Sequence, residues 1–153
     1  HQPHPRALYK PLVQVQCKPM RQVKDTLRST VRISYDGLVY KTFRGPKAEE
    51  RFANEVRVLQ FLGAKNCLFV PTLVNFYPEQ LQIVTTNCGG RVERIDERRI
   101  KELFGELEQY GVRHDDPDIR NVTYRQSDGR FCLIDFEFAT ILPPRPGEPN
   151  VHE

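Results

Sequence analysis

The sequence predicts an α+β domain built from antiparallel hairpins and a small number of helices. Three patterns indicate this class. Apolar alternation around a glycine turn predicts a hairpin over 31–43, helical apolar stripes predict helices over 46–62 and 97–110, and a second turn predicts a hairpin over 122–134. A chain of 153 residues suffices for one domain, which buries roughly 70% of its unfolded surface.

Composition excludes several classes of protein. The net charge is +3, and the basic run at 91–102 is interleaved with acids, which is typical of a solvated helix face, so we expect no nucleic-acid partner. No apolar run approaches the ~20 residues of a membrane span, so we expect no membrane contact. The cysteines are widely spaced without a CxxC pair, which favours a reducing, cytoplasmic location. A sequon at 121–123 and a chain that starts at His1 leave secretion open.

The N-terminal third begins with a poorly patterned segment. Residues 1–30 are rich in Pro, Gln and Lys and predict a partly ordered extension, with one short strand indicated by alternation at 13–17. Apolar alternation over 31–35, a two-residue Asp-Gly turn at 36–37 and a β-rich run over 38–43 then predict the first hairpin.

Two helices and two further strands follow. Pro46 suits a first helical position, Gly63 a helix end, and the stripe between them is formed by Phe52, Val56, Leu59 and Leu62. Strands are predicted over 68–77 and 80–88. Asp96 predicts the cap of a second helix that ends at Gly111, with a stripe formed by Ile100, Leu103, Phe104, Leu107 and Tyr110.

The second hairpin brings distant polar residues together. Its strands, 122–124 and 130–134, are joined through a Ser-Asp-Gly turn, and the midpoint between Asn121 and Asp135 falls inside that turn. An ideal register would therefore place the two α-carbons roughly 5 Å apart. Amide and carboxylate oxygens suit Mg²⁺. Asp116 lies in the loop that enters the same end and can sit near the metal without binding it.

Lys41 is the second notable polar residue. It shares one face of its predicted strand with Val39 and Phe43, where an unpaired ammonium would be costly, and Glu55 on the next helix is an available partner. A lysine oriented beside an apolar roof suits a nucleotide, with Val39 over the base and Lys41 on the phosphates.

The order and spacing of these motifs resemble the protein-kinase superfamily, which includes serine/threonine kinase-like proteins and small-molecule phosphotransferases of the aminoglycoside-kinase type. The likeness covers residues 31 to 139. The segments that carry it are "GLVYKTF" at 37–43, "FANEVRVLQFLG" at 52–63, "LQIVTTNCGG" at 81–90, "HDDPDIRN" at 114–121 and "IDFE" at 134–137.

This resemblance implies a minimal bilobal fold. An antiparallel N-lobe sheet with one helix would occupy about 31–86, a hinge about 86–90, and a much reduced C-lobe about 91–142. The segment 1–30 and a Pro-rich tail over 143–153 would lie outside this domain.

The resemblance also implies a role for each site residue. The catalytic set is Asp116 as base with the ion pair Lys41 and Glu55. The contacts to ATP are Val39, Lys41, the gatekeeper Thr85, and backbone groups of Thr86 and Cys88. The ligands for Mg²⁺ are Asn121 and Asp135.

Simpler interpretations stay open beside these roles. Lys41 and Glu55 could form an ordinary strand-to-helix ion pair, and Asp116 and Asn121 could simply cap their loop. His114 is expected to be a packing and hydrogen-bonding residue, and Cys88 a small apolar residue of the hinge.

Several positions depart from the family pattern. No Gly-x-Gly-x-x-Gly loop precedes Lys41, Asp115 and Asp118 stand where the family keeps cations, and Glu137 stands where it keeps glycine. Only 18 residues follow Asp135, too few for an ordinary activation segment.

Two function classes therefore remain. The favoured one is an ATP- and Mg²⁺-dependent phosphotransferase that transfers the γ-phosphate to a hydroxyl acceptor on a protein or small molecule. The alternative is a pseudokinase-like module that binds a nucleotide or a partner protein without turnover. A partner protein could also complete the reduced C-lobe.

Overall fold

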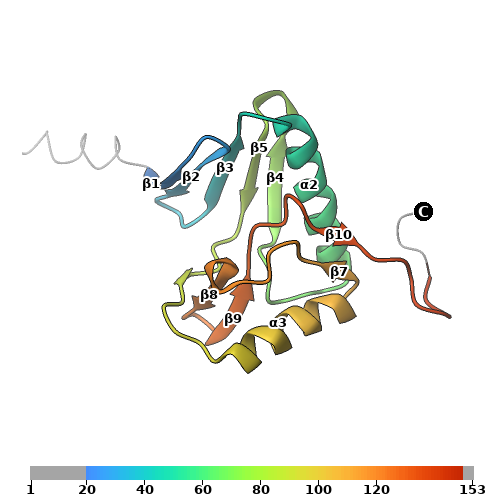
Figure 1. Cartoon of the computed structure of the whole chain (residues 1–153). Coiled ribbons are helices and arrows are strands. Elements are labelled where there is room, and N and C mark those ends of the chain that lie inside the picture. The colour runs from blue at the N-terminus through green and yellow to red at the C-terminus, as the bar shows by residue number, and fades with distance from the viewer. Residues whose placement is uncertain (1–19, 150–153) are drawn as a thin grey trace, which may run out of the picture.

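The computed structural model describes residues 20–149, and the strand indicated at 13–17 lies outside this range. An N-terminal lobe contains a five-stranded antiparallel sheet of order β1-β2-β3-β5-β4 (Figure 1). Its strands are β1 (Met20–Asp25), β2 (Ser29–Ser34), β3 (Val39–Phe43), β4 (Leu73–Tyr77) and β5 (Gln82–Thr85). A short 3₁₀ turn, η1 (Pro78–Gln80), connects β4 to β5. Part of the segment assigned to an extension thus belongs to the sheet.

The first hairpin differs from its prediction by one residue. Ile33 pairs with Val39, and the amide of Ser34 donates to the carbonyl of Leu38, which leaves a three-residue loop. The two-residue turn predicted here is therefore wrong. Gly37 adopts a φ of 87°, the left-handed conformation that three-residue hairpin loops place at their last position.

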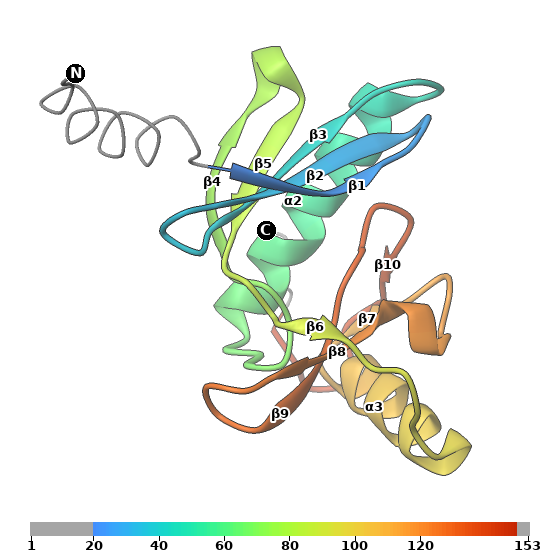
Figure 2. The ribbon, with the colours of Figure 1, turned by 90° about the vertical axis from the view of Figure 1, so that its left-hand side faces the viewer.

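Helix α2 (Ala48–Ala64) packs against the five-stranded sheet (Figure 2). The predicted apolar stripe is buried, which confirms the periodicity argument. The helix begins two residues after Pro46 and includes Gly63, so both predicted ends were slightly misplaced. Two charged residues, Arg51 and Glu55, are buried on the same face because they lie four positions apart.

A smaller C-terminal lobe contains α3 (Glu97–Gln109) and short strands. As predicted, Asp96 caps α3, accepting a hydrogen bond from the Arg98 amide at 2.9 Å. The remaining elements are β6 (Gly90–Arg91), β7 (Val112–Arg113), η2 (Ile119–Asn121), β8 (Val122–Arg125), β9 (Arg130–Leu133) and β10 (Thr140–Ile141), paired as β6-β8-β9 and β7-β10. None of the helices within 20–149 is long and apolar enough to cross a membrane.

The β8–β9 hairpin has a register one residue away from the prediction. Arg125 pairs with Arg130 across a four-residue turn, and the carbonyl of Asn121 accepts a hydrogen bond from Ile134 rather than lying opposite Asp135. A one-residue slip reverses the face of a side chain in a regular strand. Asp135, however, has a φ of 71° and leaves strand geometry, an unusual conformation for a residue other than glycine.

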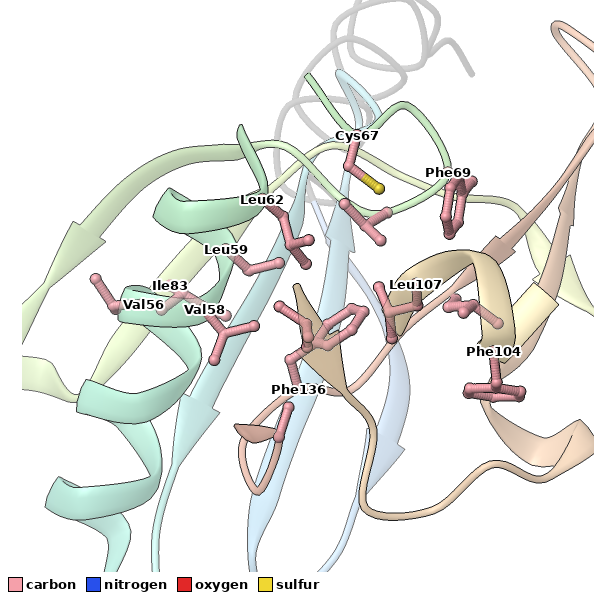
Figure 3. Close-up of a cluster of buried hydrophobic side chains, with 14 of the residues drawn as sticks. Val56, Val58, Leu59, Leu62, Cys67, Phe69, Ile83, Phe104, Leu107 and Phe136 are labelled. Carbon is pink, nitrogen blue, oxygen red and sulfur yellow. The ribbon is translucent and has the colours of Figure 1, made fainter. Parts of the chain in front are cut away.

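One hydrophobic core joins the two lobes. Figure 3 shows side chains of α2 and of α3 on either side of Phe136, which is fully buried. Phe136 directly follows Asp135, so the packing of one fixes the backbone of the other. Beyond the core, the first part of the Pro-rich tail contacts the body, since Glu148 pairs with Lys65 and Arg145 donates to the carbonyl of Gln109.

Candidate functional site

Lys41 lies at the centre of a cluster of carboxylates. Its ammonium is 2.8 Å from Glu55 Oε1, 2.9 Å from Glu137 Oε2 and 3.3 Å from Asp135 Oδ1. Burial alone would lower the pKa of Lys41, but attraction to Glu55, Asp135 and Glu137 more than offsets it, so the pKa is raised and the lysine is charged. Burial raises the pKa of Glu55, and the lysine opposes that rise. The predicted Lys41–Glu55 pair is present in the structure.

Glu137 extends this cluster to a second buried cation. Its Oε1 accepts from Arg51 Nη1 at 3.0 Å, while Oε2 contacts Lys41. The other oxygen of Glu55 accepts from the Phe136 amide at 3.1 Å, which ties α2 to the segment after Asp135. The cluster is thus fixed on every side by charged or backbone partners.

The loop before β8 positions a second set of polar groups. Arg120 forms a two-pronged pair with Asp116, at 2.7 and 2.9 Å, and this hydrogen bonding lowers the pKa of Asp116. The amide nitrogen of Asn121 donates to the backbone carbonyl and to Oδ2 of Asp116, at 2.9 and 3.1 Å. The pair is exposed, in contrast to the Lys41 cluster.

His114 has a structural role in this loop. Its Nδ1 accepts the amide proton of Asp116 at 3.0 Å, so the ring proton is assigned to Nε2, which donates to the carbonyl of Ile134 at 2.9 Å. The ring also packs edge-on against Phe104 and tilted against Phe136. His114 thus packs and hydrogen bonds as the sequence predicts.

The two remaining acids of the loop have different surroundings. Asp118 begins the η2 turn, where its side chain accepts from the Arg120 amide at 3.1 Å. Asp115 lies beside His114 with its side chain 39% exposed, and the partial desolvation of its carboxyl raises its pKa. Asp118 therefore orders the loop, while Asp115 faces the cavity described next.

A cavity of about 470 Å³ lies between the lobes, within the range of small-molecule sites. Asp116, Asn121 and Asp135 line its C-terminal-lobe side, called the floor below, and the β1–β2 turn, residues 26–28, lines it from the N-terminal lobe together with Ser29, the first residue of β2. This short turn connects β1 to β2 and contains no glycine. Lys41 does not itself line the cavity, but its ammonium contacts Asp135 and Glu137, which do.

The expected adenine contacts lie outside the lining of this cavity. Val39 pairs with Thr85 across β3 and β5. The Thr86 amide donates to the Thr72 carbonyl at 3.0 Å, and the carbonyl of Cys88 accepts from Thr123 Oγ1 at 2.7 Å. Contacts between these residues and a base therefore stay predictions, and those backbone groups would have to share or exchange partners.

The donor set is suited to a metal ion at the cavity floor. Among the described residues, the side-chain hydrogen bonds of Asn121 use its amide nitrogen, so the amide oxygen is the atom it can offer a cation. Asp135 offers a carboxylate beside it. Carboxylates of Glu55, Asp135 and Glu137 also lie within 4.8 Å of one another, but the ammonium of Lys41 contacts all three. Asn121 and Asp135 thus fit Mg²⁺ better than that buried trio does.

Among solved structures, the chain is similar to APH(2")-IIa, an aminoglycoside phosphotransferase, in a ternary complex with streptomycin and ATP. The TM-score is 0.60 and the sequence identity 14%, over 92% of this chain and 73% of that one. The fold is protein-kinase-like. The predicted α+β fold with an antiparallel N-lobe sheet and a reduced C-lobe is thereby confirmed. No protein-family model and no curated protein matches the chain.

Three site features were missed by the sequence argument. Arg51 is one helical turn before Glu55 on the same face, and that spacing was the available signal. Glu137 was noted as a departure but not as a partner of Lys41. Arg120, directly before Asn121, supplies a cation beside Asp116 that a search for lysine at position 118 overlooks.

Proposed function

We propose that this chain is a phosphotransferase that binds Mg²⁺·ATP between its lobes and transfers the γ-phosphate to a hydroxyl of a protein or small molecule. One observation carries the proposal. Lys41 contacts Asp135, and Asp135 lines the same cavity as Asp116 and Asn121, so four groups from three separate parts of the sequence converge at this cavity. This convergence is what in-line phosphoryl transfer requires of a protein.

The assigned roles follow from the position and charge of each group. Lys41 is fully charged and orients phosphate oxygens, because the third of its hydrogen bonds points to Asp135 at the cavity. Asn121 and Asp135 would hold Mg²⁺ through their oxygens. When bound, the ion would neutralise the negative charge that develops on the transferred phosphate.

Asp116 acts by positioning rather than as a strong base. Its hydrogen bonds from Arg120 and Asn121 keep it ionised, with a pKa below its usual range. A carboxylate of low basicity can still accept a hydrogen bond from the acceptor hydroxyl and align it for attack. Because Asp116 is exposed, an acceptor can approach it from solvent.

A second function, nucleotide or partner binding without turnover, is favoured by one observation. Arg120 contacts both oxygens of Asp116. An acceptor hydroxyl would have to share an oxygen with the guanidinium or displace it. If this exchange does not happen, the same cavity binds a nucleotide and does no chemistry.

Incubation with γ-labelled ATP and Mg²⁺, alone and with a cell lysate or an aminoglycoside panel, separates the two functions. We expect Asp116→Asn to lower the transfer rate by roughly 10²–10⁴, because positioning is lost, while ATP affinity stays within a few-fold. Asp115→Asn, in the same loop, should change the rate much less. Equal rates for the wild type and Asp116→Asn would contradict the phosphotransferase function and favour binding without turnover.

Nucleotide binding itself is tested by thermal melting. Mg²⁺·ATP at 100 times Kd should add about 2.7 kcal/mol of stability and raise Tm by several degrees. Asp135→Asn should remove most of the magnesium-dependent part. An unchanged Tm of the wild type in saturating Mg²⁺·ATP would contradict both functions that involve a nucleotide.

A further inference from the structure

Glu137 is a buried carboxylate held between two cations. Its side chain is 6% exposed, one oxygen contacts Lys41 at 2.9 Å and the other contacts Arg51 at 3.0 Å. A buried carboxylate is stable only when it is paired and hydrogen bonded, and Glu137 is both. Glu137 lies two residues after Asp135 and lines the cavity with it, so the pairing with Lys41 and Arg51 is made at the wall of the cavity.

Arg51 connects Glu137 to two loops of the N-terminal lobe. Its guanidinium donates to the carbonyl of Arg28 at 3.3 Å, of Arg44 at 2.6 Å and of Pro46 at 2.9 Å, besides its bond to Glu137. All three of its nitrogens are therefore engaged, in a side chain that is only 3% exposed. The flat fork of an arginine can satisfy such a set, whereas the single ammonium of lysine cannot.

One of these carbonyls belongs to the turn that covers the cavity. Arg28 lies in the β1–β2 turn, and its carbonyl accepts from both Arg51 and the Arg44 amide. Within the turn, Thr26 Oγ1 accepts from the amides of Arg28 and Ser29, each at 3.2 Å. The turn contains no glycine. Its backbone is held by Thr26 within the turn and by Arg51 and the Arg44 amide outside it.

Glu137 also restricts the direction of Lys41. An ammonium has three donor hydrogens. Glu55 and Glu137, both buried, take two of them at 2.8 and 2.9 Å, and the third points to Asp135 at 3.3 Å. Asp135 is the most exposed of the three carboxylates. Glu137 therefore leaves Lys41 one donor, and that donor contacts Asp135, which lines the cavity.

We propose that Arg51 and Glu137 are positioning residues, which together hold the β1–β2 turn over the cavity and aim Lys41 into it. The pair replaces the constraint that a longer, glycine-rich loop would supply. The mechanical part of this proposal concerns the unliganded protein, and its effect on ATP rests on the proposed function.

The mechanical part is tested by amide hydrogen exchange without a nucleotide. In Glu137→Gln, which keeps the shape and removes the charge, exchange of the Ser29 and Arg44 amides should become about tenfold faster through local opening, with α3 amides within twofold of wild type. Arg51→Lys, which keeps the charge and loses the fork, should behave in the same way and is the milder variant if Glu137→Gln folds poorly.

Asp128→Asn is the matched control, because Asp128 also bridges two cations, Arg125 at 2.8 Å and Arg130 at 3.2 Å, but lies outside the cavity. It should leave exchange in the β1–β2 turn unchanged. No acceleration in the turn, or an equal acceleration throughout α3, would overturn the proposal, since the pair would then serve only global stability.

The functional part is tested by titrating ATP at saturating MgCl₂, and then MgCl₂ at fixed ATP. Both Arg51→Lys and Glu137→Gln should weaken ATP affinity by about tenfold, because Lys41 would no longer be oriented towards the phosphates. The magnesium requirement should be unchanged. A changed magnesium requirement in Glu137→Gln alone would make Glu137 a metal ligand and overturn the positioning role. If the wild type binds no ATP, the proposed function fails, while the exchange experiment still decides the mechanical part.

Discussion

Lys41 and Arg120 are both cations paired with carboxylates at one cavity, yet their surroundings are opposite. Lys41 is almost fully buried and contacts three carboxylates that belong to α2 and to the segment after β9. Arg120 is mostly exposed and contacts two acids of its own loop, Asp116 and Asp118. The first cluster joins distant parts of the chain, and the second joins neighbours.

This difference separates what must stay fixed from what can exchange partners. Removing one member of a buried ion pair leaves an uncompensated charge in a medium that cannot solvate it. Removing one member of an exposed pair costs little, because water replaces the lost partner. The Lys41 cluster is therefore suited to hold the lobes in a defined relation, and the Asp116–Arg120 pair is suited to exchange partners.

The largest effect is expected from Lys41→Met. The substitution keeps the volume and leaves Glu55 and Glu137 buried without their shared cation, so we expect a loss of about 3–5 kcal/mol of unfolding free energy. Urea denaturation of both proteins measures this loss. The exposed counterpart, Arg120→Met, should lose no more than about 1 kcal/mol. Equal losses for the two variants would show that burial does not distinguish the clusters.

A double-mutant cycle sharpens the contrast within the buried cluster. Lys41→Met and Glu55→Gln remove two groups that lie 2.8 Å apart, so the double variant should be more stable than the sum of the single losses predicts, by about 0.5–3 kcal/mol. The measurement is again unfolding free energy in urea. Additive losses would mean that Glu137 and Asp135, rather than Glu55, carry the interaction with the lysine.

The buried cluster was also the part that the sequence predicted best. Period-2 alternation places Lys41 on an apolar face, where an unpaired ammonium would be costly, and Glu55 on the next helix is the partner available to it. Arg51 and Glu137 could not be paired in this way. Arg51 and Glu137 are 86 positions apart. Their contact depends on the packing of Phe136 between the lobes, and the periodicity of a single helix or strand cannot predict it.

The loop before β8 was predicted only coarsely, for a different reason. The sequence places Asn121 and Asp135 correctly at the open end of the β8–β9 hairpin. The predicted register is one residue off because a four-residue turn was taken for a three-residue one. Asp135 still lines the cavity with Asn121 because its backbone turns out of the strand at a φ of 71°. Aspartate tolerates left-handed backbone better than most residues, but which aspartate adopts it is set by tertiary packing rather than by a local pattern.

Arg120→Gln gives a smaller effect that reports on the exposed pair. Hydrogen bonding from Arg120 is the main cause of the lowered pKa of Asp116, so its removal should raise that pKa towards the ordinary value, as measured by NMR titration. A carboxyl whose pKa is lower in the folded than in the unfolded state stabilises the fold at pH values above the unfolded pKa. This stabilisation is lost as the pH falls through the folded pKa. The stability difference between the wild type and Arg120→Gln should therefore be constant near pH 7 and shrink below about pH 4. If the pKa of Asp116 does not change in Arg120→Gln, the hydrogen bond from Asn121 is the cause of its low value.

The smallest effect is expected at Asp128, which resembles Asp116 in exposure but is remote from the cavity. Hydrogen bonds from Arg125 and then Arg130 lower its pKa to about 2. Because the folded pKa is depressed, the pairs stabilise the protein above the unfolded value near 3.8 and are lost as pH falls towards 2. Asp128→Asn should thus lower Tm slightly at pH 7, with a difference that vanishes across this window. At 1 M NaCl, where the screening length is about 3 Å, the difference at pH 7 should also shrink. A Tm difference that resists both acid and salt would mean that Asp128 acts through the geometry of the β8–β9 turn rather than through its charge.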